Sequence, residues 1–452
     1  MFSDDFYFGA SMSGFQVEMG NPKYVDKNTD WYHWATSKAI IDQGLVSGDN
    51  PTDGPDYFSN YELCHDLAKE CGMKMLRVGI EWSRIFPQET FDIKDINELK
   101  EMADDKVISL YRKILEDMKR KDISTMVTLS HFTLPIWLND PVKMKIEKDF
   151  SRSGWYDERS IDEFNKFVMI IGEELKDLVD YWVTENEPNI SIMGLKFDKS
   201  GFPPCLNSEE MYNKALINES RAHEKAYKTL KGITEKPVGV VLALECQTGE
   251  WDLVKKIQKE YVEPLVDLFE PFDFLGVNYY SRYYAEMVNG ELKKIKGFGQ
   301  DSVSNSFTAD NRPTSDMGWE IYPEGLFNMI KMLHYKYKKP FFITENGIAD
   351  DFDCYRPYYL VGHLYAIERL IEDGVDLRGY LHWSLIDNFE WPEGFDKKFG
   401  LIHCNYSDKS FTPRPSYYIY SKIINEKSTK NFKNFLRFPY EIWDDRKIIR
   451  EN

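Results

Sequence analysis

Eight short segments rich in β-branched and aromatic residues recur along the 452-residue chain, and most are followed by a stretch with helical periodicity. The predicted strands are Phe6–Ala10, Lys74–Ile80, Ser124–Leu129, Tyr181–Thr184, Val238–Leu242, Phe274–Val277, Phe341–Thr344 and Gly379–Trp383. The predicted helices are Asp56–Glu70, Val107–Arg120, Ile161–Leu178, Ser208–Leu230 and Tyr355–Glu372. Strands that alternate with helices pair in parallel and carry the helices outside. Eight such units favour an α/β fold, a closed (β/α)8 TIM barrel, over the alternative of an open doubly wound sheet.

The chain shows no Ser/Gly linker and no sharp change of composition, so we expect a single barrel domain over residues 1–452. Barrels of this kind can exceed roughly 400 residues when they carry insertions. Residues 29–55 and 281–318 are rich in Gly, Pro, Asn and Asp and show no clear period. Because long connections in a compact domain usually shape a binding site, we expect both to be active-site loops.

The net charge of −18 argues against nucleic acid and anionic membranes as partners, because it repels phosphate groups. The first residues, MFSDDFYFGAS, are acidic where a signal peptide is basic, and no apolar run reaches the roughly 18 residues of a membrane span. The six cysteines form no CxxC pair, and the eight histidines show no HxH or HExxH spacing. We therefore expect free thiols in a cytoplasmic protein, with no metal and no cofactor.

Polar and aromatic side chains lie near the ends of six predicted strands, Arg77 within its strand and the others at or after the strand end, where the reactive groups of such a barrel gather. They are Arg77, Glu81 and Trp82; His131 and Phe132; Glu185, Asn186 and Glu187; Asn278, Tyr279 and Tyr280; Glu345 and Asn346; and the stretch Trp383 to Trp391. Cleavage of an acetal at neutral pH needs two carboxyl groups, one of them protonated. Aromatic rings suit the apolar faces of sugars, and amides, His and Glu suit their hydroxyls. The sequence therefore predicts a sugar site.

Each of these residues also has a purely structural explanation. A strand-end Glu often lies beside a helix cap, a Trp is usually core, and a lone His is most often a hydrogen-bonded structural residue. Arg77 is harder to explain in this way, because a guanidinium in an apolar strand needs a carboxylate partner. Spacing alone leaves two points open. Glu185 and Glu187 would point to the same side of an extended strand, so spacing does not choose between them. Nor does spacing define the distance between the two catalytic carboxyl groups, which is about 5 Å in retaining enzymes and longer in inverting ones.

The segments Asn186-Glu187-Pro188, Ile343–Gly347 (ITENG) and Asp387–Trp391 (DNFEW) resemble the motifs of glycoside hydrolase family 1. The resemblance extends from Phe8-Gly9-Ala10 to Arg414-Pro415-Ser416. The stretches GFQVEMG, HFTLPIWL and TENGIADDFDCYRPYYL are similar to archaeal-type β-glycosidases, which act as β-glucosidases and β-galactosidases. The resemblance implies hydrolysis of terminal non-reducing β-D-glucosyl or β-D-galactosyl residues by double displacement.

The resemblance also implies a role for each residue that matches a family motif. Glu187 would be the acid/base and Glu345 the nucleophile. Gln16, His131, Asn186, Glu390 and Trp391 would bind the non-reducing sugar above the Trp383 platform, and Arg77, Asn278 and Tyr280 would orient the nucleophile. Glu185 stands where the family usually has an apolar residue, which puts an extra carboxylate near the acid/base, and its effect on the pH profile stays open. Archaeal-type members often form oligomers, so a homo-oligomer is an open alternative to a monomer.

Two other functions fit the sequence less well. A 6-phospho-β-glycosidase has the same fold, but Glu390 would repel the phosphate of its substrate. A non-catalytic sugar-binding relative would usually have lost one of the two carboxylates, and both are present. The substrates are therefore expected to be unphosphorylated β-linked oligosaccharides or glycosides. The choice between glucose and galactose, the leaving group, and hydrolysis against transglycosylation stay open.

Overall fold

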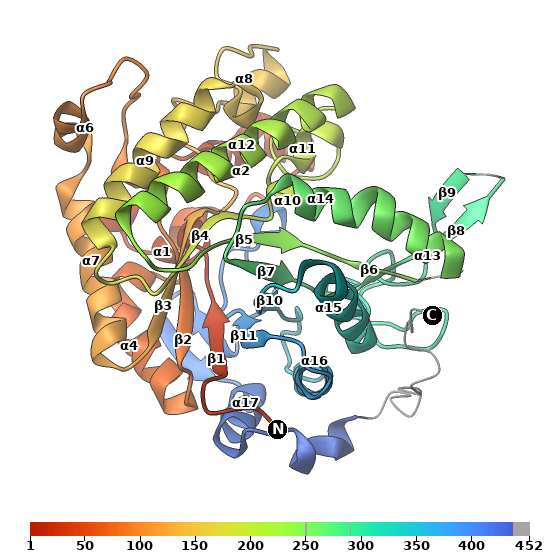
Figure 1. Cartoon of the computed structure of the whole chain (residues 1–452). Coiled ribbons are helices and arrows are strands. Elements are labelled where there is room, and N and C mark those ends of the chain that lie inside the picture. Colours follow the sequence, from red (N-terminus) through yellow and green to blue (C-terminus); the bar gives the residue numbers. More distant parts are fainter. Residues whose placement is uncertain (249–250, 290, 437–452) are drawn as a thin grey trace.

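The computed structural model describes residues 1–248, 251–289 and 291–436, and a closed barrel of eight parallel strands lies at its centre (Figure 1). The strands are β1 (Tyr7–Ser11), β2 (Met75–Gly79), β3 (Ser124–Ser130), β4 (Tyr181–Asn186), β5 (Val238–Ala243), β7 (Phe274–Asn278), β10 (Phe341–Asn346) and β11 (Leu377–Trp383). They follow one another around the barrel in chain order, and β1 pairs with β11 to close it. The predicted (β/α)8 barrel is confirmed, and each of the eight predicted strands forms part of it.

A layer of apolar side chains fills the barrel interior away from the polar strand ends. Seven barrel strands contribute one residue each, namely Met75, Met126, Val183, Val241, Phe274, Phe342 and Leu381. On the eighth strand, a Cβ at Gly9 would lie 1.9 Å from the backbone oxygen of Met75. Because β1 and β2 approach this closely, only glycine fits there. The barrel is therefore a packed core and not a pore.

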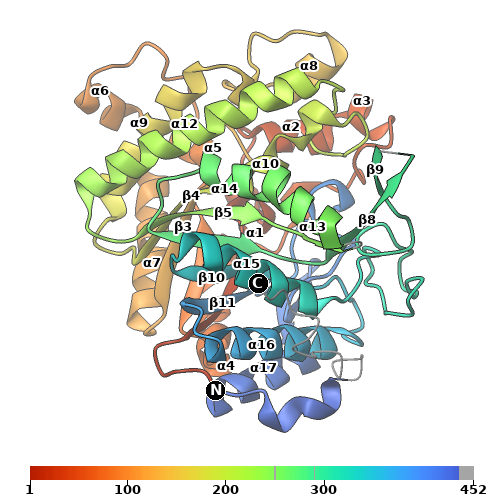
Figure 2. The ribbon, with the colours of Figure 1, turned by 45° about the vertical axis from the view of Figure 1, so that its right-hand side comes forward.

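Helices cover the outside of the barrel. They are α4 (Tyr57–Cys71), α7 (Asp105–Arg120), α9 (Arg159–Leu175), α12 (Glu209–Ile233), α13 (Trp251–Ile257), α14 (Glu263–Leu268), α15 (Pro323–Tyr337), α16 (Arg356–Glu372) and α17 (Pro415–Glu426). Asp104 caps α7 by accepting hydrogen bonds from two backbone N–H groups, and Ile108, Tyr111 and Leu115 bury one face of that helix. All five predicted helices are confirmed, whereas α13, α14, α15 and α17 were not predicted. Figure 2 shows α16 and α17 packed side by side near the N-terminus.

Short elements fill the connections between strands and helices. They are α1 (Gly14–Glu18), α2 (Asp30–Thr36), α3 (Lys38–Ile41), α5 (Trp82–Ile85), α6 (Ile96–Met102), α8 (Pro141–Ile146), α10 (Pro188–Ser191), α11 (Met193–Lys196), β6 (Cys246–Thr248), β8 (Arg282–Val288), β9 (Glu291–Lys294), β12 (Ile402–Asn405) and β13 (Ser410–Pro413). The prediction that residues 29–55 form an irregular loop was wrong in part, because they contain α2 and α3. Trp31 and Trp34 of α2 are fully buried, and these contacts with distant residues stabilise a helix that shows no period. No helix in the described ranges is long and apolar enough to cross a membrane.

Candidate active site

Arg77 of β2 connects four barrel strands at the polar end of the barrel. Its side chain is buried, and its NH1 donates to Oε1 of Glu345 at 2.6 Å. NH2 donates to Oδ1 of Asn186 at 2.6 Å, and Nε donates to Oγ1 of Thr128 at 2.8 Å. A buried guanidinium is tolerated only when its donors and its charge are satisfied in this way. The strands β2, β3, β4 and β10 are thereby held in a fixed relation around one cation.

Glu345, at the end of β10, has donors on both carboxyl oxygens. Oε1 accepts from Arg77, and Oε2 accepts from the hydroxyl of Tyr280 at 2.8 Å. Burial raises the pKa of Glu345, but the charge of Arg77 and the hydrogen bond from Tyr280 act in the opposite direction. The two donors favour the carboxylate form and fix its orientation.

Glu187 lies directly after β4 in a left-handed backbone conformation with φ of 46°. Its Oε1 accepts a hydrogen bond from Nδ2 of Asn278 at 2.7 Å. Burial and then the negative charge of Glu345 raise the pKa of Glu187 to about 8. Glu187 is therefore protonated at neutral pH, next to a carboxyl group whose donors stabilise its anion. Two carboxyl groups with such different environments can act as an acid and an anion in the same reaction.

Asn278, at the end of β7, lies between the two carboxyl groups. It was expected to orient Glu345, and a hydrogen bond from it does oppose the upward shift of the Glu345 pKa. Its amide nitrogen also contacts Oε1 of Glu187 and Oδ1 of Asn186, the latter at 3.1 Å. The hydroxyl of Thr344 donates to its oxygen at 2.7 Å. Asn278 therefore orients the candidate acid as well, a contact that sequence spacing does not indicate.

His131 stacks between two tryptophans, with ring centroids 5.9 Å from Trp383 and 6.0 Å from Trp391. Its Nε2 lies 3.1 Å from Nδ2 of Asn186, whose oxygen is occupied by Arg77. Because Nδ2 can only donate, Nε2 of His131 must accept, and the ring proton is on Nδ1. Burial and the charge of Arg77 hold the pKa of His131 well below its usual value. The neutral ring thus has an N–H with no partner among the described residues, available to a sugar hydroxyl.

Gln16 and Glu390 lie together although they are far apart in the sequence. Nε2 of Gln16, on α1, donates to the backbone oxygen of Phe389 at 2.7 Å and to Oδ1 of Asn388 at 3.0 Å, and it lies 3.5 Å from Oε2 of Glu390. Burial and the charge of Glu345 raise the pKa of Glu390 to about 8, against hydrogen bonds from Trp383 and Gln16. At neutral pH Glu390 can therefore both donate to and accept from neighbouring hydroxyl groups.

A pocket of about 270 Å³ opens at this end of the barrel. The predicted residues that line it are His131, Glu187, Asn278, Tyr280, Glu345, Trp383, Glu390 and Trp391. The other three predicted residues, Gln16, Arg77 and Asn186, do not line it but contact Glu390, Glu345 and His131. The pocket also contains Phe132, one of the aromatic residues after the predicted strands, and residues that were not predicted, among them Ile190, Met193, Phe202, Glu245, Tyr283, Gln300, Met317, Trp319 and Glu393. Glu245 follows β5, a strand whose end contributed no candidate, so inspection of that end would have found it.

Glu185 does not share a side of β4 with Glu187, so that prediction was wrong. The register of β4 against β5 shifts between Val183 and Asn186, which breaks the alternation of side chains. Glu185 is fully buried, its oxygens have no hydrogen-bond partner among the described residues, and its charge acts on Glu219 of α12. It is absent from the pocket wall, and it lies between the barrel and this helix. Burial raises the pKa of Glu185 well above the usual value for a carboxyl group.

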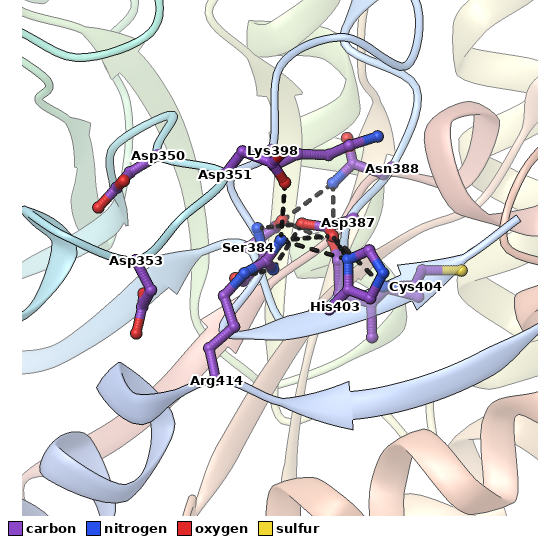
Figure 3. A network of polar contacts seen from close by, with 12 residues as sticks. Asp350, Asp351, Asp353, Ser384, Asp387, Asn388, Lys398, His403, Cys404 and Arg414 are labelled. Carbon is purple, nitrogen blue, oxygen red and sulfur yellow. Dashed lines mark hydrogen bonds and ion pairs between the residues drawn. The ribbon is translucent and has the colours of Figure 1, made fainter. Parts of the chain in front are cut away.

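A buried network outside the pocket holds the loop that follows β11 (Figure 3). Both terminal nitrogens of Arg414 donate to Asp387, one to each oxygen, at 2.9 Å. His403 contacts the same carboxylate at 3.1 Å, and the backbone N–H groups of Gly400 and Cys404 donate to it at 3.0 and 3.2 Å. Burial alone would raise the pKa of Asp387, but His403 and the charge of Arg414 outweigh it and lower that pKa. This ion pair therefore anchors the segment that presents Asn388 and Glu390.

Replacing Arg414 with methionine is expected to lower the free energy of unfolding by about 3–5 kcal/mol at pH 7, because Asp387 is left as an uncompensated buried charge. A carboxyl group with a lowered native pKa stabilises the fold above its unfolded pKa, and this contribution disappears as the pH falls through the native pKa. The difference from wild type should therefore shrink in acid. Urea unfolding at several pH values measures it. The double variant Arg414→Met/Asp387→Leu should be more stable than Arg414→Met, and equal stability would contradict the assignment.

An acetal is stable in neutral water unless an acid protonates its leaving oxygen while an anion meets the cationic carbon. Glu187, which is protonated, can supply the acid, and Glu345, which accepts hydrogen bonds from Arg77 and Tyr280, can supply the anion. Both lie in a pocket lined by aromatic and amide side chains. Fold and site together define a glycoside hydrolase.

Comparisons with known proteins agree with this class. The sequence matches the profile of glycosyl hydrolase family 1 over residues 1–260 and 252–429, and the chain belongs to this family. It is 38% identical to a β-galactosidase of Saccharolobus solfataricus, over 93% of this chain and 94% of that protein. A crystal structure of a hyperthermophilic β-glucosidase from Pyrococcus furiosus superimposes with a TM-score of 0.91 at 41% identity, over 94% and 96% of the two chains. The structure of a β-glucosidase mutant derived from a hyperthermophilic tetrameric structure superimposes with a TM-score of 0.93 at 39% identity, over 100% of both chains. The family predicted from the motifs is confirmed.

Proposed function

We propose that this retaining β-glycosidase, which acts on terminal non-reducing β-D-glucosyl and β-D-galactosyl residues, uses Glu345 as nucleophile and Glu187 as acid/base. The unequal environment of the two carboxyl groups carries the assignment. Arg77 and Tyr280 donate to Glu345, whereas an amide of Asn278 is the donor to Glu187. A cation and a phenol stabilise an anion, and a neutral amide leaves the second group able to keep its proton.

The reaction then has two steps. The Glu345 carboxylate attacks the anomeric carbon while Glu187 gives its proton to the leaving oxygen, and the bond between that carbon and oxygen breaks. In the resulting ester Glu345 carries no charge, so the repulsion that raises the pKa of Glu187 is removed. Glu187 becomes a stronger acid and its carboxylate is available as a base. It takes a proton from water, whose oxygen attacks the same carbon and releases Glu345.

The alkaline limb of the pH profile should report Glu187. The protonated form is the active one, so kcat/KM is expected to be retained below pH 8 and to fall about tenfold per pH unit above its pKa of about 8. Protonation of Glu345 should cause the loss of activity at low pH. Because the pKa of Glu390 is also raised to about 8, the profile is compared with that of Glu390→Gln. If Glu390→Gln lowers kcat/KM but keeps the decline in activity above pH 8, the decline is assigned to Glu187. If the decline disappears in Glu390→Gln, this assignment is contradicted.

The substrate is proposed to be an unphosphorylated glucoside or galactoside. The mostly protonated Glu390, with Gln16 and His131, offers both donors and acceptors to sugar hydroxyls and no cation for a phosphate. A panel of aryl β-glycosides tests the class, with gluco, galacto, manno, fuco and 6-phospho-gluco substrates. We expect turnover of the gluco and galacto compounds at the highest rates. Preference for the phosphorylated substrate would overturn the assignment.

We further propose that residues 1–452 form one domain, that the protein acts in the cytoplasm, and that it is a homo-oligomer. The buried thiols of Cys64, Cys71 and Cys404, which are free, favour a reducing compartment. One similar structure is described as derived from a tetramer, which supports the oligomer. Light scattering on the purified protein tests the oligomeric state, and a mass equal to that of one chain would contradict it.

A further inference from the structure

Glu81 is a carboxyl group at the end of β2 that the proposed mechanism does not use. It is buried, and it is not among the residues that line the pocket. Its Oε1 accepts the backbone N–H of Phe15, on α1, at 2.8 Å, and its Oε2 lies 2.6 Å from the hydroxyl oxygen of Thr133, in the segment after β3. Because β1, β2 and β3 are neighbours in the barrel, Glu81 connects the segments that follow three adjacent strands.

The hydrogen bond from Phe15 takes the place of a helix cap. Ser13, which precedes α1, makes no capping bond, and its hydroxyl donates instead to Oε1 of Gln16 at 2.7 Å. A helix leaves the N–H groups of its first turn without partners, and Glu81 accepts from one of them. The approach is close, since a Cβ at Gly14 would lie 2.6 Å from Oε1 of Glu81. Glycine at this position therefore leaves the space that the carboxyl group fills.

Both bridged segments contact Trp391 of the pocket wall. The ring of Phe15 stacks on the Trp391 ring, with centroids 5.8 Å apart and an interplanar angle of 7°. The ring of Phe132, which precedes Thr133, lies 5.0 Å from the same ring, and that of His131 lies 6.0 Å from it. The place of Trp391 therefore depends on how α1 and the segment after β3 are held together.

Gln16 connects α1 to a second group of the pocket wall. Its backbone oxygen accepts the N–H of Phe389 at 3.2 Å, and its side-chain nitrogen donates to the backbone oxygen of Phe389 at 2.7 Å. The same nitrogen lies 3.5 Å from Oε2 of Glu390. A displacement of α1 would therefore move Gln16 and Glu390 relative to Glu345. A misplacement of about 1 Å, even one that originates far from the reacting atoms, can lower a rate by about 10²-fold.

The bridge can form in either protonation state of Glu81. Burial raises the pKa of Glu81 to about 7, and the hydrogen bond from Thr133 opposes this shift. The carboxylate accepts from both partners. In the protonated form the carbonyl oxygen still accepts from Phe15, and the O–H can donate to the Thr133 hydroxyl, which is both a donor and an acceptor. A glutamine offers the same pattern through its oxygen and its amide nitrogen.

We propose that Glu81 is a positioning residue for sugar recognition, because it holds α1 against the segment after β3 and thereby fixes Gln16 and Trp391. The inference rests on the proposed function, since it requires Gln16 and its neighbour Glu390 to bind the sugar. Glu81 itself touches neither the sugar nor the reacting atoms.

The first experiment compares Glu81→Leu, which removes both acceptors, with Glu81→Gln, which can keep both hydrogen bonds. On p-nitrophenyl β-glucoside we expect kcat/KM per folded enzyme to fall about tenfold or more in Glu81→Leu and to stay within about threefold of wild type in Glu81→Gln. The matched control is Glu163→Leu, since Glu163 of α9 is buried, accepts from the Thr90 hydroxyl at 2.6 Å and does not line the pocket. Equal losses in the two leucine variants, or equal losses in the two Glu81 variants, would overturn the proposal.

A second experiment asks whether Glu81 acts through Gln16. A residue that positions another loses part of its effect once that other residue is removed. We therefore expect the loss of kcat/KM caused by Glu81→Leu to be at least about threefold smaller in a Gln16→Ala background than in wild type. Losses that simply multiply would overturn the proposal. Full activity of Gln16→Ala alone would instead contradict the proposed role of Gln16 in sugar binding.

Thr133→Val is a milder variant that keeps Glu81 and serves if Glu81→Leu does not fold. We expect it to lower kcat/KM about three- to tenfold, and Thr133→Ser, which retains the hydroxyl, to restore most of the loss. Thr90→Val is the control, because it removes the same kind of hydrogen bond from Glu163, away from the pocket. A loss in Thr133→Val no larger than that in Thr90→Val would overturn the proposal.

Discussion

Replacing Glu345 with glycine is expected to lower kcat on p-nitrophenyl β-glucoside by about 10⁴-fold or more, because no group is left to form the covalent intermediate. The change also leaves the buried Arg77 without its carboxylate partner, next to an empty space. A small anion should therefore bind there. Added azide is expected to restore turnover of a substrate with a good leaving group, and to give the α-glycosyl azide, since it attacks from the face that Glu345 uses.

Steady-state rates and the anomeric configuration of the product measure this prediction. Glu345→Gln is the matched control, because glutamine is as inactive as a nucleophile but fills the space that azide would enter. Azide rescue in the glycine variant alone supports the assignment of the nucleophile. Near-wild-type hydrolysis by Glu345→Gly would refute the mechanism, and a β-configured azide would place the attack on the other face.

Replacing Glu187 with glutamine is expected to lower kcat/KM for a disaccharide by about 10²–10⁴-fold, the range for loss of a general acid. A 2,4-dinitrophenyl glucoside, whose leaving group departs without a proton, should lose far less in the first step. The matched control is Glu185→Gln, two residues away. Because Glu185 lies between β4 and α12, behind the pocket wall, we expect this variant to stay within about threefold of wild type on both substrates.

The comparison of the two variants decides which neighbouring glutamate is the acid. Pre-steady-state release of dinitrophenol separates the first step from hydrolysis of the glycosyl-enzyme, which needs Glu187 as base. A large loss of kcat/KM in Glu185→Gln that depends on the leaving group would instead assign the role of general acid to Glu185. A uniform loss on all substrates in Glu187→Gln would indicate damage to binding rather than removal of a proton donor.

Most of the barrel could be predicted from local patterns. Each barrel strand is buried on both sides, so it appears in the sequence as a short apolar run whose period and length identify it. The polar residues directly after such runs must meet at one end of a closed barrel, and strand order alone therefore places Arg77, Glu345 and His131 together. Helix α2 was missed because its stability comes from the burial of Trp31 and Trp34 against distant residues and not from a local period.

The amino-acid sequence by itself determined the barrel, the family and the strand-end position of both glutamates, because these depend on residue type and on order along the chain. Tertiary structure alone decided three other points. The register shift in β4 turned Glu185 toward α12 and left Glu187 in the pocket. Arg77 and Tyr280 donate to Glu345 and favour its anion, whereas burial and the charge of Glu345 raise the pKa of Glu187 to about 8.

The third point is one wall of the pocket. Glu245, Tyr283 and Gln300 are separated in the sequence, and they line the pocket together only because the fold brings them to one end of the barrel. Electrostatic shifts and hydrogen-bond partners depend on distances between residues that are remote in the sequence. They are therefore set by packing, whereas the barrel that places these residues is already encoded in the local pattern.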